Sequence, residues 1–122
     1  MTSLPTHPGL RTSRDGDILT VTLCNPDKRN VQTPTLWHTL AEIATTLDRE
    51  IRLVILNAEG QDFSAGLDRG MLSPDGMPGE PRVLSVAANR GMGETTELIT
   101  AFQRGFTAWG ECSAIVLAAV QG

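Results

Sequence analysis

The clearest hydrophobic pattern in the chain is a strict alternation over residues 18–23. Leu19, Val21 and Leu23 fall on one face of an extended chain, and the residues between them fall on the other face. A period of two is typical of a β-strand that buries one of its faces. The alternation ends at an Asn-Pro-Asp cluster over residues 25–27, where we expect a turn.

A helical period follows this turn. Thr33 is a suitable N-cap and Pro34 suits the first helical position, so we predict an amphipathic helix from Pro34 to about Glu50. Its apolar stripe would consist of Leu36, Leu40, Ile43, Ala44 and Leu47. The uninterrupted apolar run over residues 53–56 predicts a strand covered on both faces. Strand, helix and strand together predict a βαβ unit.

The second half of the chain is less regular. Residues 72–91 are rich in Pro and Gly and predict an irregular excursion, with a short helical turn over residues 83–88. Helical spacing returns over residues 98–109. The apolar run over residues 114–120 predicts a further strand of the kind that is buried on both sides. Because the sequence ends two residues later, we expect its edge and apolar face to be uncovered and to favour association.

The composition fits one ordinary domain. We divide the 122 residues into 1–14, an N-terminal arm with the start of the first strand, and 15–122, a single α/β domain. The formal charge is −4 and no basic stripe is present, so we do not expect nucleic acid as a partner. No apolar run is long enough for a membrane span, and the first ten residues lack the apolar segment of a signal peptide. We therefore expect a cytoplasmic protein.

Residues that could bind a metal ion are few and scattered. Cys24 and Cys112 lie far apart among small or apolar neighbours, which predicts buried free thiols. His7 and His38 have no evident partner in the pattern and are predicted to lie on the surface. The sequence therefore predicts no metal site.

The loop over residues 61–69 carries the groups best suited to chemistry. Its small residues 64–66 would let a ligand approach the backbone closely, and Gly66 lacks the side chain that would block this approach. Asp62 and Asp68 could transfer a proton. Alternatively, each could bond its own backbone or cap the next helix.

Three segments stand out by their order and separation. They are residues 25–30 (Asn-Pro-Asp-Lys-Arg-Asn), 63–68 (Phe-Ser-Ala-Gly-Leu-Asp) and 119–122 (Ala-Val-Gln-Gly). They resemble three successive motifs of the enoyl-CoA hydratase/isomerase (crotonase) family, and the resemblance covers the chain from about Asp15 onward. It implies an α/β fold built as a crotonase-like spiral of ββα units, incomplete at the C-terminus. It also implies a homo-oligomer, a trimer or a hexamer.

The same resemblance implies how an acyl-CoA thioester would be bound. In that family two backbone N–H groups bind the thioester oxygen, and by position the first belongs to Leu67 while the second lies beyond Gly122. The usual acid and base also come from the later portion, so we expect little activity from the 122 residues alone. The expected acyl-CoA-binding residues are Lys28, Arg29, Ala65, Gly66, Leu67, Asp68 and Arg69. The three cations among them could equally be solvated surface residues.

The chemistry of such thioesters explains why backbone donors matter. Hydration, double-bond shift and carbon–carbon cleavage all pass through an enolate-like state with negative charge on the thioester oxygen, which preorganised N–H groups stabilise. The sequence thus predicts an enzyme of acyl-CoA and fatty acid metabolism, with hydration of a 2-enoyl-CoA first and double-bond isomerisation second. The alternative is a truncated, catalytically inactive domain that binds acyl-CoA or a full-length partner. No separate cofactor is expected, because coenzyme A is part of the substrate.

Overall fold

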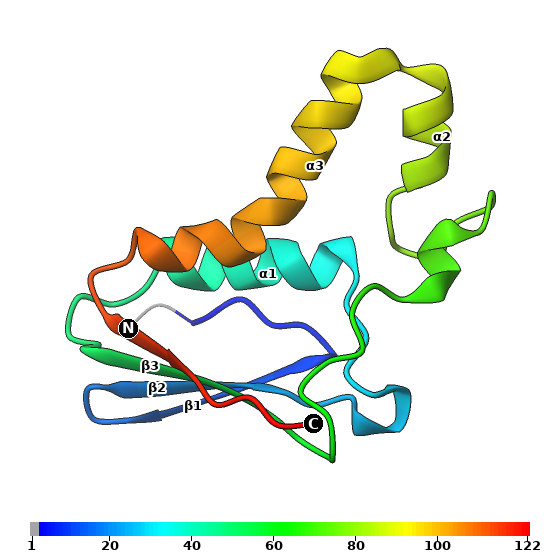
Figure 1. Ribbon diagram of the computed structural model, residues 1–122. Helices are drawn as coiled ribbons and strands as arrows, with labels where there is room; N and C mark the ends of the chain where they lie inside the picture. The colour runs from blue at the N-terminus through cyan, green and yellow to red at the C-terminus, as the bar shows by residue number, and fades with distance from the viewer. Residues whose placement is uncertain (1–2) are drawn as a thin grey trace.

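The computed structural model describes residues 3–122, which form a four-stranded sheet with helices on one face (Figure 1). The strands are β1 (Leu10–Asp15), β2 (Ile18–Leu23), β3 (Leu53–Ala58) and β4 (Ile115–Ala118), and they are ordered β1-β2-β3-β4 across the sheet. β1 runs antiparallel to β2, whereas β2, β3 and β4 are mutually parallel. The predicted strand over residues 18–23 and the βαβ unit are confirmed.

Strand β1 is an element that the hydrophobic pattern did not predict. It pairs with β2 along its whole length, from Leu10 opposite Leu23 to Asp15 opposite Ile18. Gly16 takes φ +61 in the connecting turn, a conformation that glycine adopts without strain. The pattern fails here because β1 is an edge strand of mostly polar residues, with alternate half-buried and exposed positions. Its pairing with β2, rather than its own hydrophobicity, makes it a strand.

Helix α1 (Pro34–Thr45) connects β2 to β3 and is shorter than the predicted helix, which ran to about Glu50. After its end, the Asp48 side chain accepts a hydrogen bond from the Glu50 N–H (2.9 Å), and the Asp48 carbonyl accepts one from Ile51 (3.0 Å). These bonds form a local turn that competes with helix continuation. The apolar stripe of the helix packs as predicted.

The hydrophobic core lies between the sheet and the helices. Leu19 and Val21 of β2, Ile43 of α1 and Val54 of β3 are at most 2% exposed. Val54 is nevertheless the single fully buried residue of β3, so the prediction of a strand covered on both faces was wrong. The reason is architectural, because α1 and the end of the next long helix lie over one face of the sheet (Figure 1).

The irregular excursion contains more helix than the Pro and Gly pattern predicted. Helix α2 (Val83–Asn89) leads into α3 (Gly91–Thr107), and the two project away from the sheet (Figure 1). Only the C-terminal part of α3 packs on α1. There Gly105 lies directly against Trp37, whose ring centroid is 5.2 Å from that of Phe102.

Strand β4 is an edge of the sheet, and most of its apolar side chains are uncovered, as expected. Ile115 and Leu117 are 73% and 55% exposed. The two thiols differ from their prediction, because Cys24 and Cys112 are half-buried rather than buried. Cys24 follows directly after β2, with its Sγ 3.5 Å from the Pro8 carbonyl oxygen.

Candidate functional site: a backbone donor at the end of the parallel strands

The candidate site lies at the carboxyl ends of the parallel strands, where ligands commonly bind in open α/β sheets. The loop over residues 59–68 leaves β3 there. Asn30, only 2% exposed, holds this loop: its Nδ2 donates to the carbonyl oxygens of Glu59 (2.9 Å) and Asp62 (3.0 Å). Its Oδ1 accepts from the Asn25 N–H (2.8 Å). The first motif therefore folds onto the second through one buried amide.

This arrangement places two consecutive residues in the left-handed region. Arg29 has φ +55 and Asn30 has φ +53, a conformation that costs about 1 to 2 kcal/mol for a residue with a Cβ. The three hydrogen bonds of the Asn30 side chain offset this cost. The Arg29 carbonyl also accepts from the Ala65 N–H (2.8 Å). In the sequence, Asn30 stands out only as the last residue of a motif, because a buried polar residue of this kind leaves no signal in a hydrophobic pattern.

The third motif closes on the same loop from the other side. The Gln121 carbonyl accepts from the Phe63 N–H (3.0 Å), and its Nε2 donates to the Ala58 (2.9 Å) and Gly60 (3.2 Å) carbonyls. The chain end marked in Figure 1 accordingly lies beside the loop that follows β3. Three segments separated in sequence therefore meet at one place.

A single β-bridge sets the direction of the Leu67 peptide. The Gln32 N–H donates to the Gly66 carbonyl (2.7 Å), and the Gln32 carbonyl accepts from the Asp68 N–H (2.8 Å). Because peptide groups alternate along an extended chain, the N–H and C=O of Leu67 itself point away from Gln32. Within residues 3–122 the Leu67 N–H donates no hydrogen bond. It is a fixed and unused donor.

The unused donor stands at a pocket that gathers most of the predicted site. A pocket of about 520 Å³ is lined by Lys28, Arg29, Val31, Ala65, Leu67, Asp68 and Arg69. Six of the seven residues expected to bind acyl-CoA are thus neighbours, and Val31 is an addition that the sequence did not predict. The seventh, Gly66, does not line the pocket. Its carbonyl instead accepts the hydrogen bond from Gln32.

The backbone conformation of Gly66 requires a glycine. A Cβ built on it would meet no atom within 4 Å, so in the protein itself nothing is blocked by a side chain there. Its φ is +91, which residues with a Cβ rarely adopt. The glycine allows the chain to turn into the bridge with Gln32.

The two carboxylates of the loop are already engaged. Asp68 accepts from the Gly70 N–H (2.9 Å) at the start of a short 3-10 turn over Arg69–Leu72. Asp62 accepts from Arg29 Nε at 2.9 Å. The capping alternative considered for Asp68 is therefore what the structure shows, and Asp62 is half of an ion pair.

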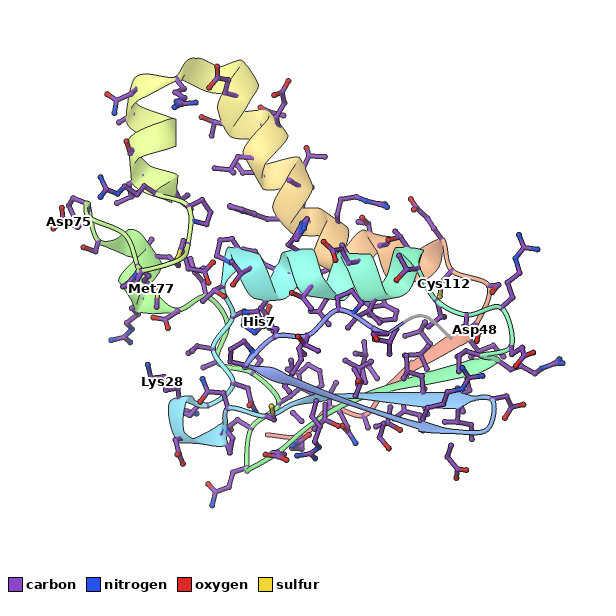
Figure 2. The ribbon with its side chains drawn as sticks, turned by 180° about the vertical axis from the view of Figure 1, so that it is seen from behind. His7, Lys28, Asp48, Asp75, Met77 and Cys112 are labelled. Carbon is purple, nitrogen blue, oxygen red and sulfur yellow. The ribbon has the colours of Figure 1, made fainter. Side chains whose placement is uncertain are left out.

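The sequence predicted that His7 lies on the surface, but the structure shows it half-buried and hydrogen-bonded. It lies beside the first turn of α1 (Figure 2), where its Nδ1 accepts from the Gly9 N–H (2.9 Å) and its Nε2 lies 2.9 Å from Thr35 Oγ1. The Thr35 N–H donates to Glu80 (2.9 Å), so Glu80 caps α1 in place of Thr33, whose side chain makes no capping bond. Burial lowers the pKa of His7, and the negative charge of Glu80 opposes this shift. His38, in contrast, is exposed as predicted and pairs with Glu42 (2.7 Å).

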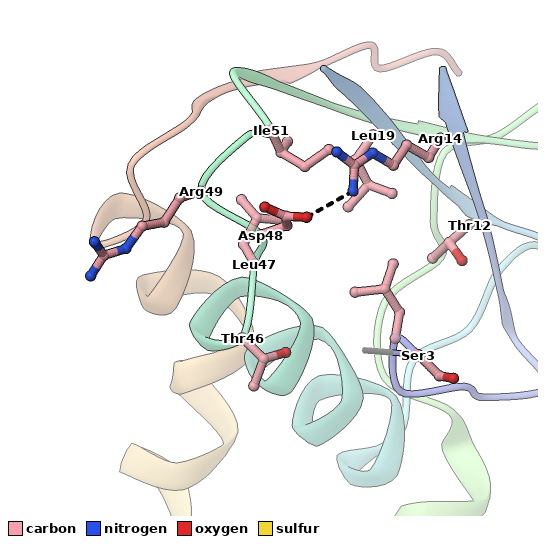
Figure 3. Close-up of a pocket in the computed structure, with 10 residues that line it drawn as sticks. Ser3, Thr12, Arg14, Leu19, Thr46, Leu47, Asp48, Arg49 and Ile51 are labelled. Carbon is pink, nitrogen blue, oxygen red and sulfur yellow. Dashed lines mark hydrogen bonds and ion pairs between the residues drawn. The ribbon is translucent and has the colours of Figure 1, made fainter. Parts of the chain in front are cut away.

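A larger cavity lies elsewhere. It has about 590 Å³ and sits at the amino ends of β2 and β3, between Leu19, Leu47 and Ile51 (Figure 3). An ion pair between Arg14 and Asp48 (3.0 Å) lies at this cavity. The Glu50 N–H and then Arg14 lower the pKa of Asp48. None of the predicted site residues lines this cavity, and it faces away from the parallel strand ends, so we do not assign the site to it.

Comparison with known proteins gives relatives of one kind. The mitochondrial Δ(3,5)-Δ(2,4)-dienoyl-CoA isomerase of Homo sapiens is 30% identical over 113 residues, which are 91% of this chain and 33% of that protein. The Rattus norvegicus isomerase is also 30% identical, over 115 residues. A candidate enoyl-CoA hydratase from Thermobifida fusca, in complex with acetoacetyl-CoA, superposes with a TM-score of 0.87 and 31% identity. That match covers 98% of this chain and 48% of that one.

The chain belongs to the enoyl-CoA hydratase/isomerase (crotonase) family. The predicted crotonase-like α/β fold is confirmed, although no family model matches the chain. A second structure of the Thermobifida fusca protein, in complex with CoA, superposes with a TM-score of 0.79 at 32% identity, over 93% of this chain and 42% of that one. This crotonase-family chain spans about a third of the length of its curated relatives and about half of these structures.

Two further findings concern residues 3–122 of this crotonase-family chain. None of the helices in this range is long and apolar enough to cross a membrane. In the same range, no three His, Cys, Asp or Glu side chains are grouped as metal ligands would be.

Proposed function

We propose that this crotonase-family chain binds an acyl-CoA thioester, with the Leu67 N–H donating a hydrogen bond to the thioester oxygen. The observation that carries the proposal is that the Leu67 N–H donates no hydrogen bond within residues 3–122, while Leu67 lines a pocket with Lys28, Ala65 and Arg69. A donor held in place before the ligand arrives needs no reorganisation when charge develops on the oxygen. Removing one such donor typically costs about 3 to 4 kcal/mol of barrier.

The cations around this pocket support the coenzyme part of the proposal. Lys28 and Arg69 are exposed and have no ion pair within residues 3–122, so both can meet the phosphates of CoA. Arg29 is already paired with Asp62 and would contribute less. We therefore rank Lys28 and Arg69 above Arg29 as phosphate contacts.

The reaction we propose is hydration of a 2-enoyl-CoA, with double-bond isomerisation as the second candidate. The names of the Thermobifida fusca protein and of the mammalian isomerases support one candidate each. Asp62 and Asp68 are engaged with Arg29 and Gly70, so neither is well placed to transfer a proton. We place the acid and base in the part of the family fold that these 122 residues do not span.

The engaged carboxylates also favour a second candidate function, binding of acyl-CoA without turnover by this chain. The loss of crotonyl-CoA absorbance on hydration distinguishes turnover from binding without turnover. Hydration by the 122-residue chain at a rate comparable to that of a full-length hydratase would contradict the split of donor and acid–base groups, whereas binding without hydration would support it.

The direct test of the donor is a titration with acetoacetyl-CoA followed by NMR. We expect the Leu67 amide resonance to move more than any other in residues 59–68, because its proton gains a hydrogen bond. Leu67→Ala keeps the N–H and is the matched control for Leu67→Pro, which removes it. Equal affinity of both variants for acetoacetyl-CoA, with an unmoved Leu67 resonance in the wild-type protein, would refute the oxyanion assignment.

Self-assembly is a separate part of the proposal. We expect a trimer or a hexamer, as the family resemblance implies. Sedimentation velocity over a range of protein concentrations measures this, and a monomer at all concentrations would contradict it.

A further inference from the structure

Side-chain hydrogen bonds connect helix α1 to the Leu67 loop. Trp37 Nε1 donates to Gln32 Oε1 (2.6 Å), and Gln32 Nε2 donates to Ser64 Oγ (2.8 Å). Ser64 Oγ in turn donates to the Asn30 carbonyl (2.7 Å) and accepts from the Gly66 N–H (3.1 Å). We call the side chains of Trp37, Gln32 and Ser64 the brace.

The direction of every bond in the brace follows from its first member. An indole N–H can only donate, so the Gln32 atom that faces it must be the amide oxygen. The amide nitrogen then faces Ser64, and the Ser64 oxygen must accept from it. The Ser64 proton is left for the Asn30 carbonyl. One donor-only group therefore sets the polarity of the whole brace.

The brace uses the full capacity of the Ser64 hydroxyl. A hydroxyl has one proton and two lone pairs, and here the proton and both lone pairs have partners. The Ser64 hydroxyl thus has a structural role and is not free to act as a nucleophile. Because one of its bonds is to the Gly66 N–H, it orients the residue immediately before Leu67.

Gln32 acts on the same place through its backbone. Its N–H and C=O bond the peptides on either side of Leu67, at Gly66 and Asp68. Its side chain is anchored by Trp37, which packs against Phe102 and against Gly105 in the part of α3 that rests on α1. The peptide of Leu67 is therefore connected, through Gln32 and Trp37, to the packed pair of helices α1 and α3.

We propose that Gln32, oriented by Trp37, is a positioning residue that fixes the direction of the Leu67 N–H for an acyl-CoA thioester oxygen. This inference rests on the proposed function of Leu67. A misplacement of about 1 Å in a catalytic geometry can cost about a hundredfold in rate, so a side chain that holds a donor has a measurable role without touching the substrate.

The experiment compares Gln32→Met, which keeps length but removes both side-chain bonds, with Gln103→Met. Gln103 is exposed on α3 and makes no hydrogen bond to the brace, so the control makes the same chemical change without breaking a bond of the brace. The probes are CoA, which has no thioester, and acetoacetyl-CoA, whose enolate absorbs in the near ultraviolet. Binding of CoA reports the pocket, and enolate absorbance per bound acetoacetyl-CoA reports the donor.

We expect Gln32→Met to bind CoA as the wild-type protein does while its enolate signal falls by about tenfold to a hundredfold. Trp37→Phe, which keeps an aromatic ring against Phe102, should shift the signal in the same direction by less. Adding Trp37→Phe to Gln32→Met should have no further effect, because both act through one chain of bonds. Gln103→Met should match the wild-type protein in every measurement.

The possible failures are distinguishable. Equal losses of CoA affinity and enolate signal in Gln32→Met would show a merely structural role and overturn the inference. An unchanged enolate signal, or Leu67 and Gly66 amide resonances in the free protein that do not respond to Gln32→Met, would also overturn it. A wild-type protein that binds neither probe would refute the proposed function, and with it the catalytic meaning of the brace.

Discussion

Two segments that follow β3 are held in opposite ways. The loop over residues 59–68 is bonded by Asn30 of the first motif, by Gln32 shortly after it and by Gln121 of the third motif. The segment over residues 73–99 has no fully buried residue among 73–85 and 87–99. Its polar tether to the helix layer is the pair of bonds from Thr35 to Glu80.

The contrast shows that one segment is held rigidly by buried hydrogen bonds while the other is held by few contacts. A backbone donor is useful only if its direction is fixed, and fixing it takes buried hydrogen bonds from several elements. A projecting helical hairpin with few buried contacts opens locally at low free energy, which suits a segment that adapts to a ligand or partner. The following predictions test this contrast.

The largest effect should come from Asn30→Ala. The change leaves the Glu59 and Asp62 carbonyls and the Asn25 N–H without their partner, and places alanine at φ +53. We expect a loss of about 2 to 4 kcal/mol in the free energy of unfolding, measured with urea. Asn89→Ala, at an exposed site on α2, is the control and should change little. A similar effect of both variants would mean that the loop is not held through Asn30.

Two glycines of α3 should respond in opposite directions to the same substitution. A Cβ on Gly105 would lie 2.8 Å from Trp37 Cβ and 2.9 Å from its backbone, whereas one on Gly93 would meet nothing. Gly105→Ala should therefore cost about 1 to 3 kcal/mol of stability. Gly93→Ala should stabilise by up to about 1 kcal/mol through helix propensity. Thermal unfolding of both variants measures this, and a neutral Gly105→Ala would show that α3 can move off α1 without loss.

Glu80→Ala should release the projecting segment with a small global effect. Loss of the cap at Thr35 should cost about 1 kcal/mol. Amide exchange should accelerate over residues 73–99 and stay unchanged over residues 59–68. Glu97→Ala, which removes an exposed carboxylate of α3, is the control. Faster exchange in both segments would show that the two are not independent.

The smallest effect concerns pH. The pKa of His7 in the folded protein is lowered from 6.5 by burial, so the folded state binds its proton less readily than the unfolded state. The stability from neutral His7 is present above pH 6.5 and decreases as pH falls below it. The Asp48 carboxyl, whose pKa is lowered from 3.8, acts only in a more acidic range. His7→Asn should therefore flatten the pH dependence of the melting temperature below pH 6.5, and an unchanged slope would contradict the assignment.

The fate of single residues shows what a pattern can predict. The alternation over 18–23 and the helical stripe that begins at Leu36 led to real elements, because burial of one face leaves a periodic signature. The end of α1 and the bounds and pairing of strand β1 were not predicted, because a turn at Asp48 and pairing at a sheet edge depend on hydrogen bonds. The prediction that His7 lies on the surface was wrong for the same reason, since its partner Thr35 is 28 residues away.

The sequence by itself determined the family, the order of the main elements and the loop that carries Leu67, since periodicity and motif order are local properties of the chain. It could not determine that the Leu67 N–H donates no hydrogen bond within residues 3–122, that the Ser64 hydroxyl has all its hydrogen bonds filled, or that Asp62 and Arg29 form an ion pair. Each of these depends on atoms from segments that only folding brings together. A hydrogen bond requires a partner at the right distance and angle, and tertiary structure alone supplies both.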